Sequence, residues 1–355
     1  MKNNHYYHQL DVFRALAALS VCAEHFNFDS FFHNHFANGL FVQLFFALSG
    51  FVIFLNYHQK IKNFIDLKFF IIKRFRRLYP LHLFFLIIFI FVEILKYLFI
   101  IKYGHQSNSD AFSVNNFNNF LLNLFFLQHF AETYNFNTPS WSISVEMMLY
   151  ITISLQFLFF KNHIIKISFL YLLIFGIFFN EIYGATLSIN AYFSGLYSFF
   201  IGCLFSYFYI KKKIILKNYF FEIFYFVILV IFLSEIFYFK LINMVFFNSI
   251  FFGLIFYLSC FLDKDSLLFK LLFNKFFQFL GKISYSIYLS HLFIFYSLKQ
   301  IMRFIFNFPM IEIDNKIILN LTYFEANLFI IVAYTLTIIF SYFSYNHIEM
   351  RFYKK

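Results

Sequence analysis

The sequence has little charge: Asp, Glu, Lys and Arg together make up 13% of its 355 residues, whereas hydrophobic residues make up 62%. A water-soluble domain of this size needs more charged and less apolar surface. The composition therefore argues against a soluble globular protein and predicts that lipid is the solvent. Apolar runs of about 20 residues recur along the chain, the length that a helix needs to cross a bilayer. The short alternating segments of a membrane β-barrel are lacking.

Cysteine is also scarce. Cys22, Cys203 and Cys260 each fall within an apolar stretch and share no paired spacing, which argues against a disulfide framework and against a zinc site. We expect no metal.

The first residues lack the basic start, apolar centre and small-residue cleavage site of a removable signal peptide, so the first apolar segment should stay in the product. Because no internal repeat, low-complexity linker or soluble second domain is visible, we predict a single membrane-embedded domain over 1–355.

Apolar segments of transmembrane length predict an all-α fold, a polytopic integral membrane helical bundle with about ten transmembrane helices. The predicted spans lie near 10–28, 39–57, 79–100, 141–160, 167–184, 190–210, 219–239, 243–262, 276–298 and 326–346. Segment 118–133 is apolar but short for a crossing, so we expect it to be interfacial or re-entrant.

The net charge of +11 would suggest nucleic acid as the partner of a soluble protein. In a membrane protein its meaning depends on where the basic residues lie along the chain. With a cytosolic N-terminus, most Lys and Arg residues fall into the predicted inside segments, in keeping with the positive-inside rule. We therefore expect a multi-pass protein of a bacterial inner membrane with both termini in the cytosol, and no nucleic-acid partner.

The first predicted span carries two ionisable residues on one helix face. Arg14 and His25 are eleven residues apart, about three full turns, which separates them by roughly 16 Å along the axis. Ionisable side chains in hydrocarbon are costly and usually face a polar interior. There His25 could act as a general base, because histidine takes and returns a proton near neutral pH. The alternative is a histidine that only hydrogen-bonds to a neighbouring helix.

The second predicted span contains Ser49 and Gly50, which we expect to permit close helix packing. A basic segment follows over 60–80. In it, Arg74 and Arg77 are one helical turn apart, and guanidinium groups bind phosphate oxygens in paired hydrogen bonds, so the two could hold the nucleotide part of coenzyme A. Charge alone favours the simpler interpretation, a topology signal or contact with anionic lipid.

The fourth predicted span begins with PSWSISVEMMLY. Trp141 suits the membrane interface, whereas Glu146 lies further inside, where an unpaired carboxylate is costly. Ser142 and Glu146 are four residues apart and could present a hydroxyl and a carboxylate to one cavity. The alternative is that Glu146 only pairs with an arginine or a histidine.

A second intramembrane histidine lies in GKISYSIYLSHLF, near the end of the chain. Ser284 and His291 are seven residues apart and share a helix face, with Tyr288 between them. His291 is therefore predicted to face inward. Alone, it could equally be an interior residue that is satisfied by its neighbours.

Together these segments resemble acyltransferase family 3, membrane proteins that O-acylate surface polysaccharides and other exported molecules. The resemblance follows the order of the motifs over nearly the whole chain: Arg14 and His25, then FFALSGF at 45–51, the RxxR of Arg74 and Arg77, WSISVE at 141–146 and SYSIYLSH at 284–291. The chain departs from the family pattern at two positions. Met147 replaces a second acidic residue, and Ser290 replaces a tryptophan that members often have.

The resemblance implies roles for the motif residues. His25 would be the catalytic base or acyl-handling group, with Arg14 as its electrostatic partner, and Glu146 would position the acceptor or handle protons. Arg74 and Arg77 would contact the coenzyme A donor. The residues expected to bind substrate are Trp141, Ser142, Ser284, Tyr288 and His291.

The expected function is a membrane O-acyltransferase that moves an acetyl or other short acyl group from cytosolic acyl-CoA to a hydroxyl of a cell-envelope polysaccharide or lipid-linked sugar. Acetyl-CoA or another acyl-CoA is the expected co-substrate, and membrane lipid and an envelope glycan are the expected partners. The main alternative is a transporter or exporter of an acidic metabolite or glycan, because intramembrane Arg, Glu and His also mark substrate pathways. The inverted repeats of a secondary transporter are not visible. The acceptor sugar, the acyl chain and the oligomeric state stay open, as does the choice between direct transfer and a transient acyl-enzyme.

Overall fold

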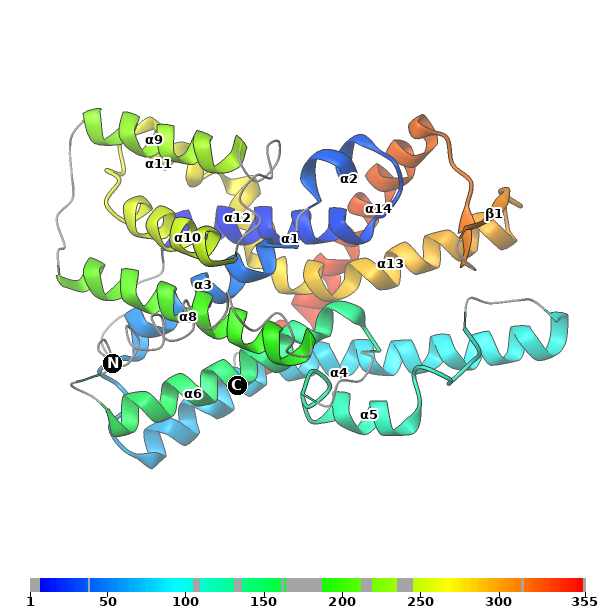
Figure 1. Ribbon diagram of the computed structural model, residues 1–355, viewed down its shortest axis with the longest axis horizontal. Helices are drawn as coiled ribbons and strands as arrows, with labels where there is room; N and C mark the ends of the chain where they lie inside the picture. The colour runs from blue at the N-terminus through cyan, green and yellow to red at the C-terminus, as the bar shows by residue number, and fades with distance from the viewer. Residues whose placement is uncertain are drawn as a thin grey trace. The chain divides into compact units, whose positions relative to one another are not determined.

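The computed structural model (Figure 1) describes residues 7–37, 39–104, 109–130, 136–160, 163, 187–211, 219–234, 245–313 and 316–353. These residues are mostly helical. The described strands are β1 (Met310–Ile313) and β2 (Lys316–Leu319), which form one antiparallel pair in which Met310 faces Leu319. The predicted helical class is therefore confirmed, with this small ribbon as an addition that the apolar pattern did not indicate.

Short 3-10 turns lie at His8–Leu10, directly before the first helix, and at Thr138–Ser140, and a π-helical turn lies at Tyr345–Glu349. In chain order, the helices are α1 (Asp11–His25), α2 (Phe31–Phe36), α3 (Phe41–Tyr57), α4 (Phe64–Tyr103), α5 (Phe117–Leu124), α6 (Trp141–Phe159), α8 (Leu187–Lys211), α9 (Tyr219–Ser234), α10 (Val245–Ser259), α11 (Leu267–Leu272), α12 (Lys275–Lys282), α13 (Ser284–Phe304), α14 (Tyr323–Ser344) and α15 (Met350–Tyr353).

Four helical stretches among the described residues are long and apolar enough to cross a membrane. They are Phe64–Lys102, Thr138–Phe159, Ala191–Lys211 and Tyr323–Phe352, and the shorter apolar helices are Phe41–Tyr57, Tyr219–Ser234 and Phe247–Ser259. These four stretches are candidate membrane spans by length and composition, whereas the number ten stays a prediction. The predicted span 167–184 lies outside the described residues. In segment 118–133, the described helix α5 has eight residues, about 12 Å of helix, which is too short to cross.

Two predicted boundaries differ from the structure. The predicted span 79–100 begins earlier in the structure, because α4 starts at Phe64, within the basic segment 60–80. Asn63 caps this helix, since its Oδ1 accepts a hydrogen bond from Asp66 N at 2.8 Å. The predicted span 276–298 is divided, since α12 ends at Lys282 and α13 begins at Ser284. The break follows Gly281, where a Cβ would lie 2.2 Å from the Asp11 carbonyl oxygen, so α12 packs directly against the start of α1.

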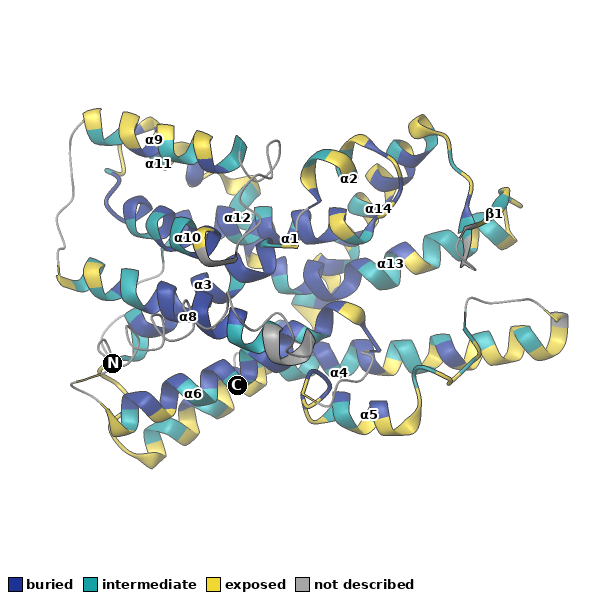
Figure 2. Ribbon diagram, in the orientation of Figure 1, coloured by how far each residue is buried: buried dark blue, intermediate teal, exposed yellow. Residues whose placement is uncertain are grey.

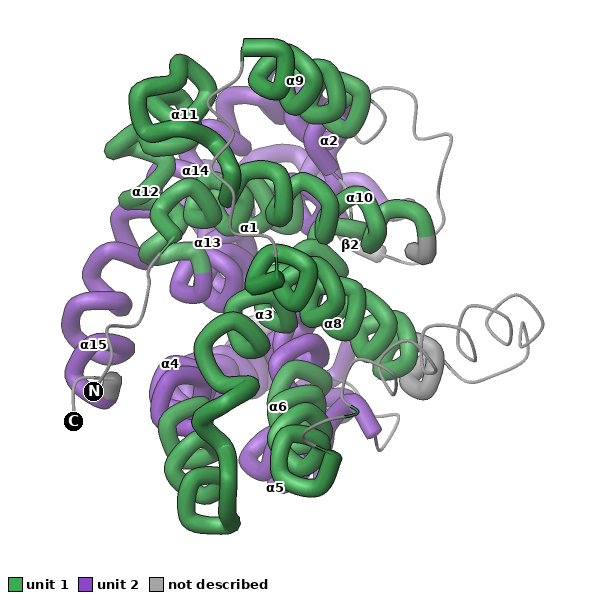
Figure 3. Tube along the Cα trace, turned by 90° about the vertical axis from the view of Figure 1, so that its left-hand side faces the viewer, with its two compact units in different colours: residues 1–21, 38–74, 145–284 green, residues 22–37, 75–144, 285–355 purple. Residues whose placement is uncertain are grey.

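Contacts divide the chain into two compact units, each built from three separate segments (Figure 3). Unit 1 contains 1–21, 38–74 and 145–284, and unit 2 contains 22–37, 75–144 and 285–355. Boundaries between the units fall inside helices α1, α4 and α6, between α2 and α3, and at the start of α13. The single domain over 1–355 stays a prediction.

Backbone-to-backbone packing of α3 against α8 organises unit 1. A Cβ added to Gly50 would lie 1.9 Å from the Phe199 carbonyl oxygen, and one added to Gly202 would lie 1.9 Å from that of Ala47. Only glycine permits so close an approach, as expected for Gly50. Buried polar side chains cross the same helices. Gln43 donates to Ser194 at 3.0 Å and accepts from Ser198 at 2.8 Å.

Aromatic packing joins the end of α1 to α13 and α14 in unit 2. The Phe26 ring stacks on Phe295 at 4.9 Å and meets the edge of Tyr334 at 5.2 Å. Many exposed residues of both units are large and apolar, among them residues of α9 and of the C-terminal half of α4, where exposed positions recur along the helix (Figure 2). Phe220 is 77% exposed and Ile101 is 65% exposed. Such surfaces are suited to lipid contact.

We predict that Gly50→Ala destabilises the protein by about 1–3 kcal/mol, because the added methyl group forces α3 and α8 apart. The measurement is reversible unfolding in mixed detergent micelles. Gly39→Ala is the matched control, since a Cβ at Gly39 meets nothing within 4 Å. Equal stability of the two variants would contradict the close backbone contact.

Candidate active site

Two histidines from distant parts of the sequence meet in unit 2. His25 is the last residue of α1, and its Nδ1 lies 3.2 Å from Nε2 of His291 in α13. The ring centroids are 5.0 Å apart. His291 is completely buried and His25 is half-buried. The structure thus brings together the two histidines that the sequence singled out in separate motifs.

Hydroxyl groups gather one turn before His291 on α13. Tyr288 OH lies 2.7 Å from Ser142 Oγ, and both hydroxyls lie within hydrogen-bonding distance of the Pro139 carbonyl oxygen, at 3.1 and 3.0 Å. Asn137, directly before the turn Thr138–Ser140, connects this turn to α13, because its Nδ2 donates to the Leu289 carbonyl at 2.8 Å. Two of the predicted substrate-binding residues, Ser142 and Tyr288, are therefore direct neighbours.

Two aromatic residues, His129 and Trp141, precede Ser142 in the sequence. The rings of Trp141 and the buried His129 lie 5.5 Å apart with an interplanar angle of 36°. Trp141, predicted to lie at a membrane interface, is half-buried at the start of α6. The two rings thus contact each other beside the hydroxyl groups of Ser142 and Tyr288.

Glu146 forms the centre of a second group of polar side chains, in unit 1. Ser49 Oγ donates to Glu146 Oε1 at 3.0 Å, and Tyr150 OH donates to the same oxygen. The hydroxyl oxygens of Ser49 and Tyr150 are 2.9 Å apart. The carboxylate thus has two hydroxyl partners. Ser49, which we expected to serve packing alone, is also a hydrogen-bond partner of Glu146.

Arg74 lies in the same unit, enclosed by aromatic rings. Its Cζ is 5.2, 5.5 and 5.8 Å from the ring centroids of Tyr57, Phe70 and Tyr150, and its Nη2 donates to Tyr57 OH at 3.0 Å. The residue is 6% exposed, and its Nε is buried with no hydrogen-bond partner in the part of the chain that the structure describes. Within the described part of the chain, no carboxylate forms an ion pair with Arg74.

Arg77 has a different environment, in unit 2. It interacts electrostatically with the buried Glu349, whose Oε2 accepts a hydrogen bond from Ser286 Oγ at 3.1 Å. Glu349 ends the π-helical turn Tyr345–Glu349, a local geometry that is frequent at functional sites. No motif in the sequence indicated this carboxylate.

The remaining predicted residues lie on the same helices. Arg14 forms an ion pair with Asp11 at 2.8 Å, one turn earlier on α1, so its ionic partner is a carboxylate of its own helix. Ser284 is buried at the first position of α13. Among the residues that the structure describes, no group of three or more His, Cys, Asp or Glu side chains is placed to hold a metal ion.

Comparison with known protein families shows which family the chain belongs to. A family model described as an acyltransferase domain matches residues 7–346, nearly the whole sequence. The chain belongs to acyltransferase family 3. The relationship that the five motifs indicated is therefore confirmed, and with it acyl transfer as the class of activity. No curated protein and no solved structure matches the chain.

Several contacts of this family member were missed at the level of sequence. Tyr150 follows Glu146 by four residues on one helix, so the spacing rule for helix neighbours could have identified it. Tyr57, the partner of Arg74, and Asn137, the partner of α13, come from other segments and carry no local signal. The roles assigned to the site residues stay predictions.

We predict that Tyr150→Phe lowers the free energy of unfolding by about 1–3 kcal/mol, because Glu146 loses a hydroxyl donor while the ring beside Arg74 remains. The measurement is reversible unfolding in mixed micelles.

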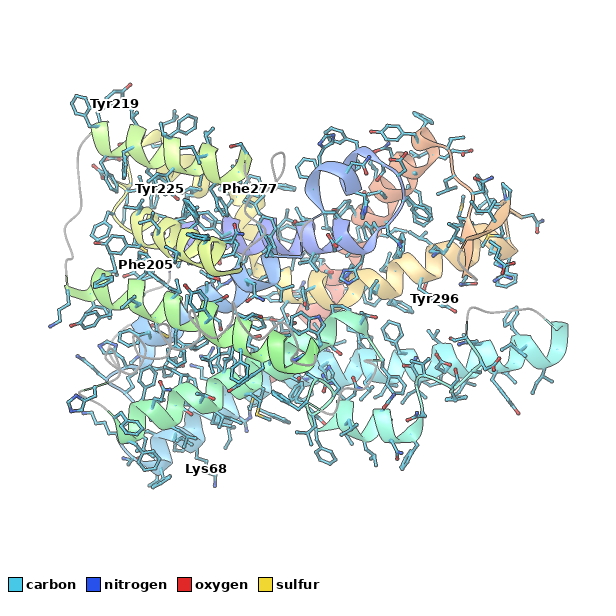
Figure 4. All side chains as sticks on the ribbon, viewed as in Figure 1. Lys68, Phe205, Tyr219, Tyr225, Phe277 and Tyr296 are labelled. Carbon is cyan, nitrogen blue, oxygen red and sulfur yellow. The ribbon has the colours of Figure 1, made fainter. Side chains whose placement is uncertain are left out.

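Tyr225→Phe is the matched control (Figure 4). Tyr225 is completely buried in α9 and its hydroxyl has no hydrogen-bond partner among the described residues, so removing that hydroxyl should leave stability unchanged or raise it. Tyr219, at the exposed start of the same helix, points outward in the same view. If Tyr225→Phe were the more damaging change, the hydroxyl contact at Glu146 would not be stabilising.

Proposed function

We propose that this protein is a membrane O-acyltransferase that moves an acetyl or other short acyl group from cytosolic acyl-CoA to a hydroxyl of a cell-envelope polysaccharide or lipid-linked sugar. The observation that carries the proposal is the contact of His25 with His291 in a chain of an acyltransferase family. Acyl transfer to an alcohol requires a base at the hydroxyl, and a half-buried histidine held by a second histidine is suited to that role.

The chemistry assigned to His25 is proton transfer. His25 takes the proton of the acceptor hydroxyl while the oxygen attacks the thioester carbonyl, and a C–O bond replaces the C–S bond. The coenzyme A sulfur leaves as a thiolate and receives the proton from His25. Arg14 is assigned the stabilisation of charge that develops on the carbonyl oxygen, and Glu146 is assigned acceptor positioning or proton handling.

The environment of Arg74 supports a donor site for coenzyme A. A buried guanidinium without a carboxylate partner among the described residues, and with a buried unpartnered Nε, is suited to an anionic ligand. Coenzyme A brings phosphate groups, which guanidinium forks bind well. Arg77, one turn further along α4, is proposed as a second contact.

The acceptor is proposed to bind where hydroxyl and aromatic side chains lie close together, at Ser142, Tyr288 and Trp141. Sugars present hydroxyl groups and flat apolar faces, which match Ser142, Tyr288 and the ring of Trp141. Ser284, on the same helix as Tyr288, is proposed as a further contact for the acceptor. A transporter of an acidic metabolite or glycan would use similar intramembrane residues, and membership of an acyltransferase family favours the enzyme.

The location follows from the same proposal. An inner-membrane protein with both termini in the cytosol would hold the basic N-terminal turns of α4 on the side where acyl-CoA is found. Membrane lipid, acyl-CoA and an envelope glycan are then the partners.

We predict that His25→Ala lowers acyl transfer at least about 100-fold, because the acceptor hydroxyl loses its base. The assay follows label from radiolabelled acetyl-CoA to candidate glycans with purified protein in lipid vesicles. His163→Ala, a change at an exposed histidine, is the control and should retain activity. Transfer that survives His25→Ala in a folded protein would remove His25 from the mechanism.

We predict that Arg74→Ala and Arg77→Ala each raise the Kd for coenzyme A by about tenfold or more, since a hydrogen bond to a charged group contributes about 1.5–3 kcal/mol. Titration calorimetry on protein in nanodiscs measures the Kd. Arg76→Ala is the matched control, because Arg76 is exposed on the same turns of α4 and carries the same charge. Equal affinity in all three variants would leave this segment with a topological role only.

A further inference from the structure

We propose that His291 is a positioning residue that holds the ring of His25 in one tautomer, so that Nε2 of His25 is the atom that takes the proton from the acceptor hydroxyl. This inference rests on the proposed acyl transfer and adds the atom at which the proton moves. It also gives His291 a role different from the substrate binding that the sequence suggested.

The hydrogen bonds of His291 determine which of its nitrogens carries the hydrogen. Its Nδ1 lies 3.3 Å from the Ile287 carbonyl oxygen, one turn earlier on α13. A carbonyl oxygen only accepts hydrogen bonds, so Nδ1 is the N–H nitrogen of His291. In neutral imidazole the other nitrogen is then an acceptor. Nε2 of His291 therefore accepts a hydrogen bond.

The same reasoning transfers to His25. Nε2 of His291 lies 3.2 Å from Nδ1 of His25, and two acceptors cannot form a hydrogen bond. Nδ1 of His25 therefore donates, which leaves the lone pair of neutral His25 on Nε2. A base needs that lone pair, so the reactive nitrogen is the one turned away from His291.

The neutral form of His291 is favoured by its surroundings. The side chain is completely buried, with the Phe26 and Tyr288 rings at centroid distances of 6.2 and 6.3 Å. A charge there would be costly, and more so beside a second cation on His25. A neutral acceptor is consequently available in every state of the reaction.

The hydrogen bond between the two rings is compatible with both forms of His25. When Nε2 of His25 takes the acceptor proton, the imidazolium carries hydrogen on both nitrogens, and Nδ1 still donates to His291. No ring rotation is required. The proton on Nε2 then passes to the departing sulfur of coenzyme A. The position of His25 at the C-terminal end of α1, where backbone carbonyls favour a positive charge, supports this cationic form.

Both ring nitrogens of His291 thus have partners within the protein. No ring nitrogen remains to bind a sugar or a thioester. A role in orienting His25 accounts for the complete burial of His291, for its contact with the backbone and for its contact with His25, whereas substrate binding accounts for none of them.

The test combines spectroscopy with kinetics on the full-length protein in nanodiscs. Ring-¹⁵N histidine labelling reports the tautomer, and the His25 signals are assigned by their loss in His25→Ala. We expect His25 to show hydrogen on Nδ1 and a lone pair on Nε2 in the neutral wild type. The opposite tautomer would overturn the proposal, whatever the activity.

Two substitutions of His291 separate orientation from packing. Gln places an amide oxygen near the position of Nε2 and can accept from His25, so His291→Gln should keep the His25 tautomer and most of kcat. Phe fills the space without an acceptor, so His291→Phe should mix the tautomers and lower kcat at least about tenfold, with KM for acetyl-CoA unchanged. An unchanged kcat in folded His291→Phe would overturn the proposal.

His82→Gln is the matched control, because His82 is also buried in unit 2 and its Nε2 lies 2.8 Å from a backbone carbonyl oxygen, that of Asn123. Its substitution should leave the His25 signals unchanged. If the wild type transfers no acyl group, the proposed function fails, while the tautomer still decides the positioning role. If His291→Phe does not fold, the wild-type spectrum and His291→Gln supply the decision.

Discussion

A polar side chain on an apolar helix must find its partner inside the protein, and this constraint determines where the helices of this chain meet. Lipid offers no hydrogen bonds, so a histidine or a carboxylate buried among phenylalanines would be costly without a neighbour. The observed partners come from distant segments: His25 with His291, Glu146 with Ser49, and Gln43 with Ser194 and Ser198. Apolar packing between such helices tolerates small shifts, whereas each of these contacts exists at one register only. The polar pairs therefore specify the arrangement that the abundant apolar residues merely permit.

How far the fold could be predicted depended on whether a feature is local. Helical class and the apolar helices follow from hydropathy, and the close packing at Gly50 follows from the missing side chain. The start of α4 was harder to predict, because a basic, proline-containing segment resembles a loop, and only the cap at Asn63 with the long helix behind it shows otherwise. The division between α12 and α13 was invisible for another reason. Gly281, near the end of α12, packs against the backbone of Asp11, and a contact between segments so far apart in the sequence gives no local signal.

The candidate site shows the same division. Motif order identified the family and selected His25, Glu146, Arg74 and His291, since these residue types are costly in hydrocarbon and need a reason to be there. The partners were not predictable in the same way. Tyr150 is within reach of the helix spacing rule, but the enclosure of Arg74 by Tyr57 and the link from Asn137 to α13 depend on how separate helices pack. Ser49 shows how a small residue in a packing motif can carry a second role, because the position that lets helices approach also brings its hydroxyl within reach of Glu146.

The choice of a histidine rather than a carboxylate as the partner of His25 follows from the same constraint. A carboxylate orients a catalytic histidine strongly and stabilises its imidazolium form, but as a buried charge it needs further donors around it. At the fully buried position of His291, the neighbouring Phe26 ring has no donor, and the hydroxyl of Tyr288 is already engaged with Ser142 and the Pro139 carbonyl. A neutral imidazole fixes the same tautomer at no cost of charge burial, with its own orientation held by the Ile287 carbonyl. It stabilises the cation less, and the carbonyl end of α1, where His25 lies, provides part of the missing negative potential. A site in an apolar bundle can thus obtain a directed base from groups that are neutral at rest.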